Sequence, residues 1–179
     1  NEDYNTMFIT NLGISIVLYV LLFFASSNIS TFFERKELTP LIKVMGSVHI
    51  INALSITQIT VLTKKLDFKT KTKTSLLSAI ISGIVGIGMA YTGFGVWALV
   101  AQVLSKQTIY TIGLWFFNRW WPDFSFNKEN FKYMWGFGSK LMLSGLLSNI
   151  WNQLYQVVVG KFYSPATLGQ YSRSKEYAN

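Results

Sequence analysis

Residues 7–27 read MFITNLGISIVLYVLLFFASS, and this stretch decides the fold class. It contains no charged residue, and Asn11 is its only strongly polar member. A helix needs about 20 mostly apolar residues to cross the hydrocarbon core of a bilayer, and this stretch meets that length. Further apolar runs at residues 40–63, 75–91, 96–117 and 134–160 predict an all-α, polytopic membrane helical bundle with about five transmembrane helices.

The overall composition agrees with a chain that is solvated by lipid. Hydrophobic residues make up 50% of the sequence and charged residues 13%, which is about half the charged share of an ordinary soluble domain. The net charge is +8, from 16 basic and 8 acidic residues. The basic residues lie mostly in short segments between apolar runs, which argues against nucleic acid as a partner. The chain has no cysteine, and we expect neither a metal nor a cofactor.

The segments between the apolar runs are short and polar. We interpret residues 28–39 and 122–133 as polar connections and residues 92–95 as a tight turn. Residues 161–179 are predicted to be the extramembrane start of a further element, with turns at Ser164-Pro165 and Gly169, so that the chain is a fragment of a longer protein. Five lysines lie between residues 64 and 73, and the positive-inside rule places that side of the membrane in the cytoplasm.

Polar side chains in the second apolar run share one helical face. His49, Asn52, Ser55 and Gln58 step by three residues, and residues at this spacing lie on the same side of a helix. This pattern predicts a span whose polar face turns into a bundle or a hydrated cavity. An amphipathic helix on a membrane or protein surface is the alternative. We expect His49 to be a hydrogen-bonded bundle residue and not a catalyst.

Two further patterns report on packing and on the membrane boundary. Small residues recur every four positions in the third run, a spacing that lets another helix approach closely; they are Ser78, Ser82, Gly86 and Ala90. Tryptophans gather where the fourth run ends, as in an interfacial aromatic belt; they are Trp115, Trp120 and Trp121.

The fourth and fifth runs carry cations and amides inside apolar sequence. Lys106 lies near the middle of residues 96–117, with Gln102 one turn away. In the fifth run Lys140 opens a band that continues through Ser144, Ser148, Asn149, Asn152, Gln153 and Gln156. Because a charged side chain facing lipid is costly, these residues need internal partners or a hydrated cavity. Interhelical hydrogen bonding and snorkelling remain open as alternatives, and an anionic, hydroxyl-rich ligand would suit such an interior.

The same runs offer little for catalysis. All eight acidic residues lie outside the apolar runs, and the chain has one histidine and no cysteine. A membrane-embedded enzyme needs a buried carboxylate, a histidine pair or an activated nucleophile. We therefore expect no catalytic residue and no enzyme, although a glycosyltransferase or acyltransferase with its site elsewhere in a longer protein stays an alternative.

Several motifs resemble a known family. The most specific is QVVVGKFYSPATLGQYSRSKEYAN at residues 156–179; LDFK at 66–69, GFGVWALV at 93–100 and GSKL at 138–141 are also similar. They resemble the Wzx-type polysaccharide and lipopolysaccharide (O-antigen) exporters of the multidrug/oligosaccharidyl-lipid/polysaccharide flippase superfamily. The family commonly has an arginine near position 64, where this chain has Lys64. The lysine keeps the positive charge but lacks the planar guanidinium that can bind an anion through two parallel hydrogen bonds.

The resemblance implies a function and a set of partners. Family members are two-lobed helical transporters that move undecaprenyl-pyrophosphate-linked oligosaccharide across the bacterial inner membrane by alternating access. Lys106 and Lys140 would then attract the pyrophosphate, while Gln102, Asn149, Asn152, Gln153 and Gln156 would contact sugar or link helices. The implied partners are this lipid-linked substrate, membrane lipids, and the polysaccharide polymerase or other export machinery. A small-molecule or drug extruder of the same fold is the alternative within transport.

Overall fold

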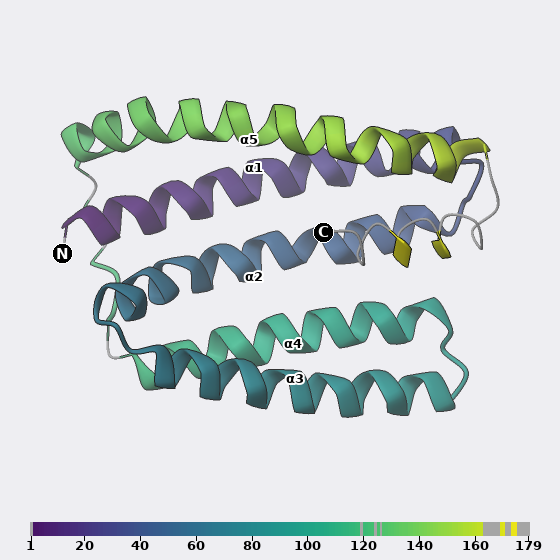
Figure 1. The fold of residues 1–179 in the computed structure, drawn as a ribbon, viewed down its shortest axis with the longest axis horizontal. Coiled ribbons are helices and arrows are strands. Elements are labelled where there is room, and N and C mark those ends of the chain that lie inside the picture. The colour runs from purple at the N-terminus through teal and green to yellow at the C-terminus, as the bar shows by residue number, and fades with distance from the viewer. Residues whose placement is uncertain are drawn as a thin grey trace.

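Five long helices make up the computed structural model (Figure 1). They are α1 (Glu2–Phe32), α2 (Leu38–Lys64), α3 (Phe68–Tyr91), α4 (Val96–Phe117) and α5 (Lys128–Phe162). The structure describes residues 2–118, 120–123, 125, 127–162, 169–170 and 173–174, with the side chains at 2, 134, 137, 152, 155, 156, 159 and 160 left out. The predicted turns at Ser164-Pro165 and Gly169 and most of the predicted extramembrane segment lie outside the described residues or at their edge.

The all-helical membrane architecture is confirmed. Three helical stretches are long and apolar enough to cross a membrane: Asp3–Phe32, Leu38–Lys64 and Phe68–Tyr91. They occupy the first three of the predicted spans. The remaining helices, α4 and α5, lie where the fourth and fifth spans were expected, and their placement across the membrane stays a prediction.

The helices begin and end differently from several predicted boundaries. The loop expected at 28–39 shrinks to residues 33–37, because α1 continues to Phe32 and α2 begins at Leu38. Pro40 therefore lies in the first turn of α2, where its missing N–H costs no hydrogen bond. The basic segment expected before residue 75 is mostly helical, since α3 begins at Phe68. Likewise, α5 begins at Lys128, inside the connection predicted at 122–133.

The first three helices end in the same backbone motif. At the end of α1 the amide of Arg35 donates to the carbonyl of Ser30, and that of Glu34 donates to Thr31. Equivalent pairs of hydrogen bonds close α2 and α3, which is the Schellman arrangement. The left-handed residue of this motif is Glu34 in α1, Leu66 in α2 and Gly93 in α3. Each of these motifs ends its helix sharply, so the next helix runs antiparallel to it after only a short turn.

The turn between α3 and α4 needs its glycines. Gly93 has φ of 84° and Gly95 has φ of 54°, values that side chains with a Cβ adopt at a cost. The tight turn predicted at residues 92–95 is therefore confirmed, and it folds α3 and α4 into a hairpin.

The α3–α4 hairpin is packed through the small residues of α3. Ser78, Ser82 and Gly86 are buried, whereas Ala90 is exposed, so three of the four predicted packing positions lie in the interface. A Cβ built on Gly86 would lie 3.0 Å from the Cβ of Gln102 in α4. Further along the hairpin, Gly113 of α4 faces the methyl group of Thr74 in α3. The interface is close because each contact has a glycine on one side, Gly86 of α3 opposite Gln102 and Gly113 of α4 opposite Thr74.

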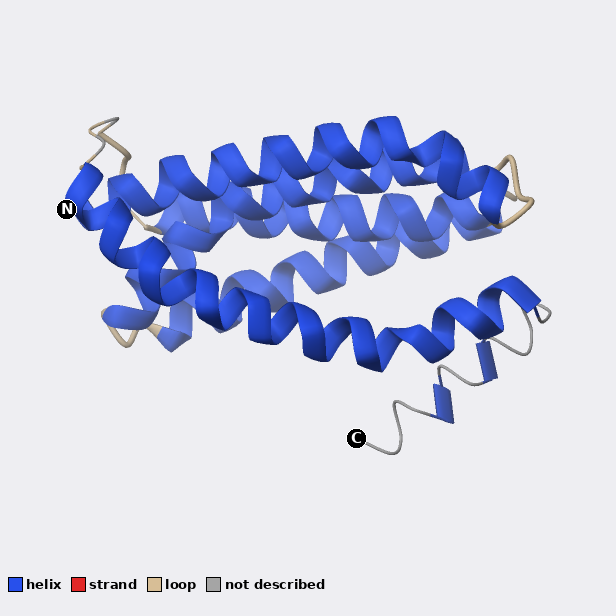
Figure 2. Cartoon of the chain, turned by 90° about the horizontal axis from the view of Figure 1, so that it is seen from above, coloured by secondary structure: helices blue, strands red, loops and turns tan. Residues whose placement is uncertain are grey.

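Four helices form the body of the bundle, and the fifth stands apart. Helix α1 packs against α2, α3 against α4, and α2 against α4 and, more lightly, against α3. Helix α5 contacts only α1 among the described helices. Figure 2 shows the helix that leads to the C-terminus diverging from the rest over most of its length. Consistently, every described side chain between Lys140 and Val158 is exposed.

Candidate functional site: polar faces of α2, α4 and α5

A ladder of hydrogen bonds joins α2 to α4. These two helices run in the same direction because two turns and one antiparallel helix separate them (Figure 1). The amide of Gln107 donates to Ser55 Oγ at 3.2 Å and to Asn52 Oδ1 at 3.3 Å. Further along, Thr111 Oγ1 donates to the carbonyl of Ile51, and Trp115 Nε1 donates to the carbonyl of Leu54 at 2.9 Å.

The ladder ends in a buried chain of amides. Asn118 Nδ2 donates to Gln58 Oε1 at 2.6 Å, and Gln58 Nε2 donates to the carbonyl of Trp120 at 3.0 Å. Gln58 is fully buried and Asn118 is 3% exposed. Buried amides without partners would be costly, so this chain fixes the end of α4 and the start of the following connection against α2.

The predicted polar face of α2 is only partly turned into the bundle. Ser55 and Gln58 are buried, as the spacing predicted, but Asn52 and His49 are exposed. His49 makes no hydrogen bond to the described part of the chain, so its role as a hydrogen-bonded bundle residue stays a prediction. The face is buried where α4 covers it and open beyond that contact.

The sequence analysis did not predict three partners of α2: Gln107 and Thr111 of α4, and Asn118 directly after it. Gln107 and Thr111 are four residues apart, which places them on one side of the helix. This spacing is the signal in the sequence for a polar contact with another helix. Their role here is structural, since they hold α4 to α2.

The tryptophans near the end of α4 gather at one end of the bundle but do more than line its edge. Phe8 of α1 lies in edge-to-face contact with Trp115 and Trp120, both with ring centroids 6.1 Å apart. Trp115 also contacts Trp121 at 5.3 Å. Trp115 and Trp120 are half-buried, and Trp121 is exposed. The cluster packs α1 against the end of α4, so only Trp121 keeps the fully exposed position expected of a belt residue.

The predicted ligand-binding residues of α4 fall into two different environments. Lys106 is exposed, and it forms no ion pair with the described residues. Gln102 is half-buried and packs on Gly86 of α3. Of the two roles expected for Gln102, linking helices fits this position better than contacting a ligand.

The predicted polar band of α5 is exposed wherever the structure describes it. Lys140, Ser144, Ser148, Asn149 and Gln153 are all exposed. The side chains of Asn152 and Gln156 lie outside the described residues. Because α5 packs only against α1 and not against α4, the structure does not bring Lys140 and Lys106 into contact. The two lysines lie on helices that do not pack against each other.

The turns and connections between helices are divided between the two ends of the bundle. Figure 1 places the N-terminus, the α2–α3 turn and the α4–α5 connection at one end, and the α1–α2 and α3–α4 turns at the other. Asn5 of α1 donates to Ser125 Oγ at 3.0 Å, which ties the connection to the start of the bundle. At the opposite end Lys161 of α5 forms an ion pair with Glu34 at 3.0 Å.

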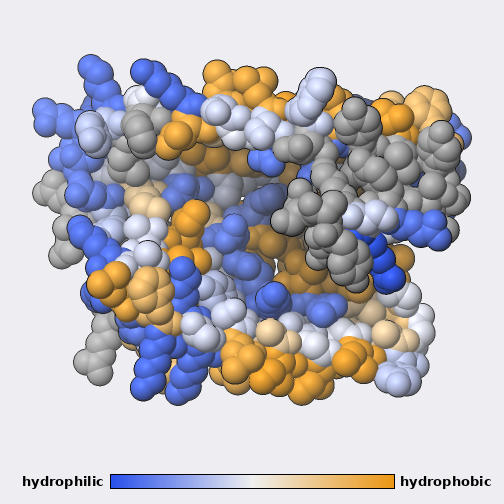
Figure 3. Space-filling view, viewed as in Figure 1, coloured by the Kyte–Doolittle hydropathy of each residue, from blue (hydrophilic) through white to orange (hydrophobic). Residues whose placement is uncertain are grey.

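The end with the α2–α3 turn is strongly basic. Residues 64–73 contain five lysines and one acid, Asp67, and Figure 3 shows hydrophilic side chains gathered at this end of the molecule, with a hollowed middle that is also partly hydrophilic. Asp67 caps α3 by accepting the Thr70 amide at 3.0 Å and the Thr70 hydroxyl at 2.7 Å. These two hydrogen bonds, helped by Lys69 and Lys65, hold the pKa of Asp67 below its usual value.

Long helices joined by short turns, apolar outer surfaces and polar contacts between helices define a polytopic helical membrane protein. Comparison with known proteins narrows this class. The chain belongs to the family described as "Polysaccharide biosynthesis protein", whose pattern matches residues 1–179. The predicted relationship to the polysaccharide exporters is therefore confirmed at the level of the family.

Two curated relatives are similar along nearly the whole chain. The succinoglycan biosynthesis transport protein ExoT of Rhizobium meliloti (strain 1021) is 22% identical over 178 residues, which cover 99% of this chain and 36% of that protein. The teichuronic acid biosynthesis protein TuaB of Bacillus subtilis (strain 168) is 26% identical over 174 residues, covering 94% of this chain and 35% of that protein. The chain thus spans about a third of the length of these relatives. No solved structure matches the chain.

Proposed function

We propose that the full-length protein moves an oligosaccharide linked to undecaprenyl pyrophosphate across the bacterial cytoplasmic membrane, for the synthesis of a surface polysaccharide. Membership in the polysaccharide biosynthesis family supports this proposal. So does the relative that is named as a transport protein for succinoglycan biosynthesis. The polysaccharide polymerase or other export machinery are the protein partners that we propose for such a function.

The observation that carries the proposal is the placement of two lysines in apolar helices. Lys106 and Lys140 are exposed on α4 and α5, and neither forms an ion pair with the described residues. A lysine that faces lipid near the middle of a span costs about 2.5–3.5 kcal/mol. Water and an anionic group of a substrate both remove this cost, and a pyrophosphate accepts a lysine as a point charge.

The amides of α5 supply a second element of the proposed site. Asn149 and Gln153 are exposed on the same helix as Lys140, and Asn152 and Gln156 continue the band in sequence. Amide groups both donate and accept hydrogen bonds, so they match the hydroxyl groups of a sugar. In this proposal the oligosaccharide follows α5 while its pyrophosphate stays near a lysine.

The loose attachment of α5 suits alternating access. Because α5 packs only against α1 among the described helices and pairs with Glu34 at its far end, its movement relative to α1–α4 would leave the α2–α4 ladder intact. Transporters built from repeats work largely by rocking one bundle against another around a central site. We assign α5 to the moving side of such a site.

The proposal is tested in cells that depend on the full-length protein for surface polysaccharide. Lys106→Gln and Lys140→Gln together should lower export by about tenfold or more, since each removes a charged contact. The lipid-linked intermediate should accumulate while the amount of protein in the membrane stays normal. Replacement of both lysines by arginine should retain most export.

Lys36→Gln is the control, because Lys36 is an exposed lysine in the α1–α2 turn, outside the apolar helices that carry Lys106 and Lys140. This variant should export at the normal level. Normal export by the double glutamine variant would contradict the proposed role of the two lysines.

A further inference from the structure

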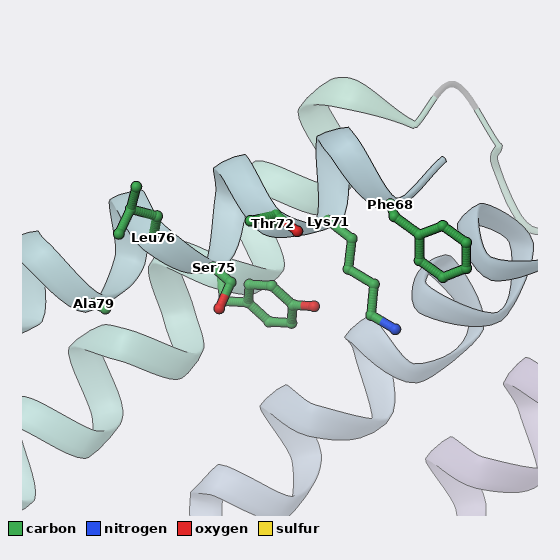
Figure 4. A pocket seen from close by; sticks show the side chains of 7 residues that line it. Phe68, Lys71, Thr72, Ser75, Leu76 and Ala79 are labelled. Atoms are coloured by element: carbon green, nitrogen blue, oxygen red, sulfur yellow. The ribbon is translucent and has the colours of Figure 1, made fainter. Parts of the chain in front are cut away.

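A cavity lies at the basic end of the bundle, and its lining contains none of the residues assigned to the proposed transport site. Its volume is about 470 Å³, and it lies between the first half of α3 and Tyr110 of α4. Five of its lining residues share one face of α3: Lys71, Thr72, Ser75, Leu76 and Ala79. Phe68 closes the end nearest the α2–α3 turn, and Figure 4 shows the Lys71 side chain extending beside the Phe68 ring.

The hydroxyl groups that line this cavity differ from other hydroxyls of α3 in their hydrogen bonding. Thr70, Thr74 and Ser78 of α3 each donate or accept hydrogen bonds within the helix or its cap. By contrast, the hydroxyls of Thr72, Ser75 and Tyr110 have no partner within the described part of the chain. Three donors therefore line one cavity and remain available to a ligand.

Lys71 is the basic residue of the cluster that is available to this cavity. Lys64 lies over the ring of Tyr4 and Lys73 over that of Phe117, both at 5.4 Å. The carboxylate of Asp67 is engaged by Thr70, and Lys71 forms no ion pair with the described residues. A half-buried cation thus stands beside unpartnered hydroxyl donors, a combination that favours a phosphate oxygen.

The depth of the cavity matches a lipid. At 1.5 Å per residue, Lys71 and Ala79 are about 12 Å apart along the axis of α3. The polar lining lies toward the start of this candidate span, and Leu76 and Ala79 lie deeper along it. A phosphate at Lys71 would place an acyl chain along these apolar residues, whereas a free phosphate would leave them uncovered.

We propose that this cavity binds the phosphate headgroup of an anionic membrane phospholipid, with Lys71 as the cation and Thr72, Ser75 and Tyr110 as the hydrogen-bond donors. Basic cavities between helices at the cytoplasmic face suit such headgroups. The lipid would bridge α3 and α4 at the end of the bundle where the basic segment meets the membrane surface. Neither Lys106 nor Lys140 lines this cavity, and the proposed ligand is a membrane phospholipid, not the transported oligosaccharide.

Native mass spectrometry of the full-length protein in detergent tests the proposal, with phosphatidylglycerol titrated as the ligand. Lys71→Gln should weaken retention by about tenfold, the loss expected for one hydrogen bond to a charged group. Ser75→Ala together with Tyr110→Phe should also weaken it, while Lys71→Arg should restore it. Lys69→Gln is the matched control: it removes one charge from the same segment without touching the cavity lining, so retention should stay within about twofold of the normal value.

The ligand controls separate the possible sources of phosphate. Phosphatidylcholine and inorganic phosphate should not compete with phosphatidylglycerol. Equal losses in Lys71→Gln and Lys69→Gln would overturn the proposal, because they would indicate unspecific attraction to the basic segment. Competition by inorganic phosphate alone, or binding of undecaprenyl pyrophosphate in the absence of phosphatidylglycerol binding, would overturn it as well.

Discussion

Single side chains decide how firmly α4 is held to α2. Gln58 accepts from Asn118 and donates to the Trp120 carbonyl, so both of its polar ends are used inside the bundle. The hydroxyl and indole contacts further along the interface use backbone carbonyls of α2. Removing one partner of a buried pair leaves the other unsatisfied, and that penalty exceeds the net value of the bond itself.

Asn118→Ala should therefore destabilise the protein by about 1–3 kcal/mol. Thermal unfolding of the full-length protein in detergent measures this as a lower midpoint. In a double-mutant cycle with Gln58→Leu, the second substitution should cost much less once the first is present. Asn28→Ala, at an exposed position of α1, should leave the midpoint unchanged. Additive losses from the two substitutions would show that the pair is not coupled.

The Asp67 cap predicts a dependence of stability on pH. Hydrogen bonds from Thr70 lower the pKa of Asp67 in the folded protein, so the cap stabilises the fold above the ordinary pKa of an aspartate. This contribution is lost as the pH falls through the lowered pKa. Asp67→Ala should lower the unfolding midpoint at neutral pH, and the difference from the unmodified protein should shrink in acid. Asp67→Asn, which can still cap the helix, is the control; a pH-independent difference for Asp67→Ala would contradict this role.

Pairs of elements are joined by close packing in one case and by polar contacts in another. The α3–α4 hairpin packs through glycine, serine and threonine, whereas α2 and α4 are joined by amides and hydroxyls. The small-residue spacing of α3 was readable in the sequence because it repeats with the helical period. The polar interface between α2 and α4 was predicted only in part, because the sequence shows which residues share a helical face but not which helix packs against that face.

Gly113→Ala tests the closeness of the α3–α4 hairpin. The new methyl group would collide with the methyl of Thr74, which is buried and cannot move aside, so we expect a loss of about 1–3 kcal/mol in the free energy of unfolding. Thr74→Ser should restore most of it, since the serine keeps the hydroxyl that bonds Thr70 and removes the colliding methyl. Gly83→Ala has open space around it and should be neutral or slightly stabilising. A failure of Thr74→Ser to rescue Gly113→Ala would rule out this contact as the cause.

The whole molecule has two distinct ends, and the alternation of helices assigns every connection to one of them. The α2–α3 turn carries the basic segment, and the α1–α2 and α3–α4 turns lie at the opposite end (Figure 1). By the positive-inside rule we expect the basic end to face the cytoplasm.

Cysteine labelling of whole cells tests this orientation, because this chain has no cysteine of its own. In full-length protein without other reactive cysteines, Lys36→Cys and Thr92→Cys should react with a membrane-impermeant thiol reagent. Leu66→Cys, which is exposed in the α2–α3 turn, should react only after the cells are opened. Labelling of Leu66→Cys in intact cells together with protection of the other two would reverse the orientation.

The sequence by itself determined the helices, because each apolar run is long enough to cross a bilayer and is bounded by polar or glycine-containing turns. It also determined the family and the alternation of the connections between two ends. Only the tertiary structure decided that Gln58 pairs with Asn118, that Gln102 packs on Gly86 and that Lys140 stands on a helix away from Lys106. The reason is physical: helical periodicity sets which side chains share a face, but the rotation and neighbours of each helix depend on packing between segments far apart in the chain.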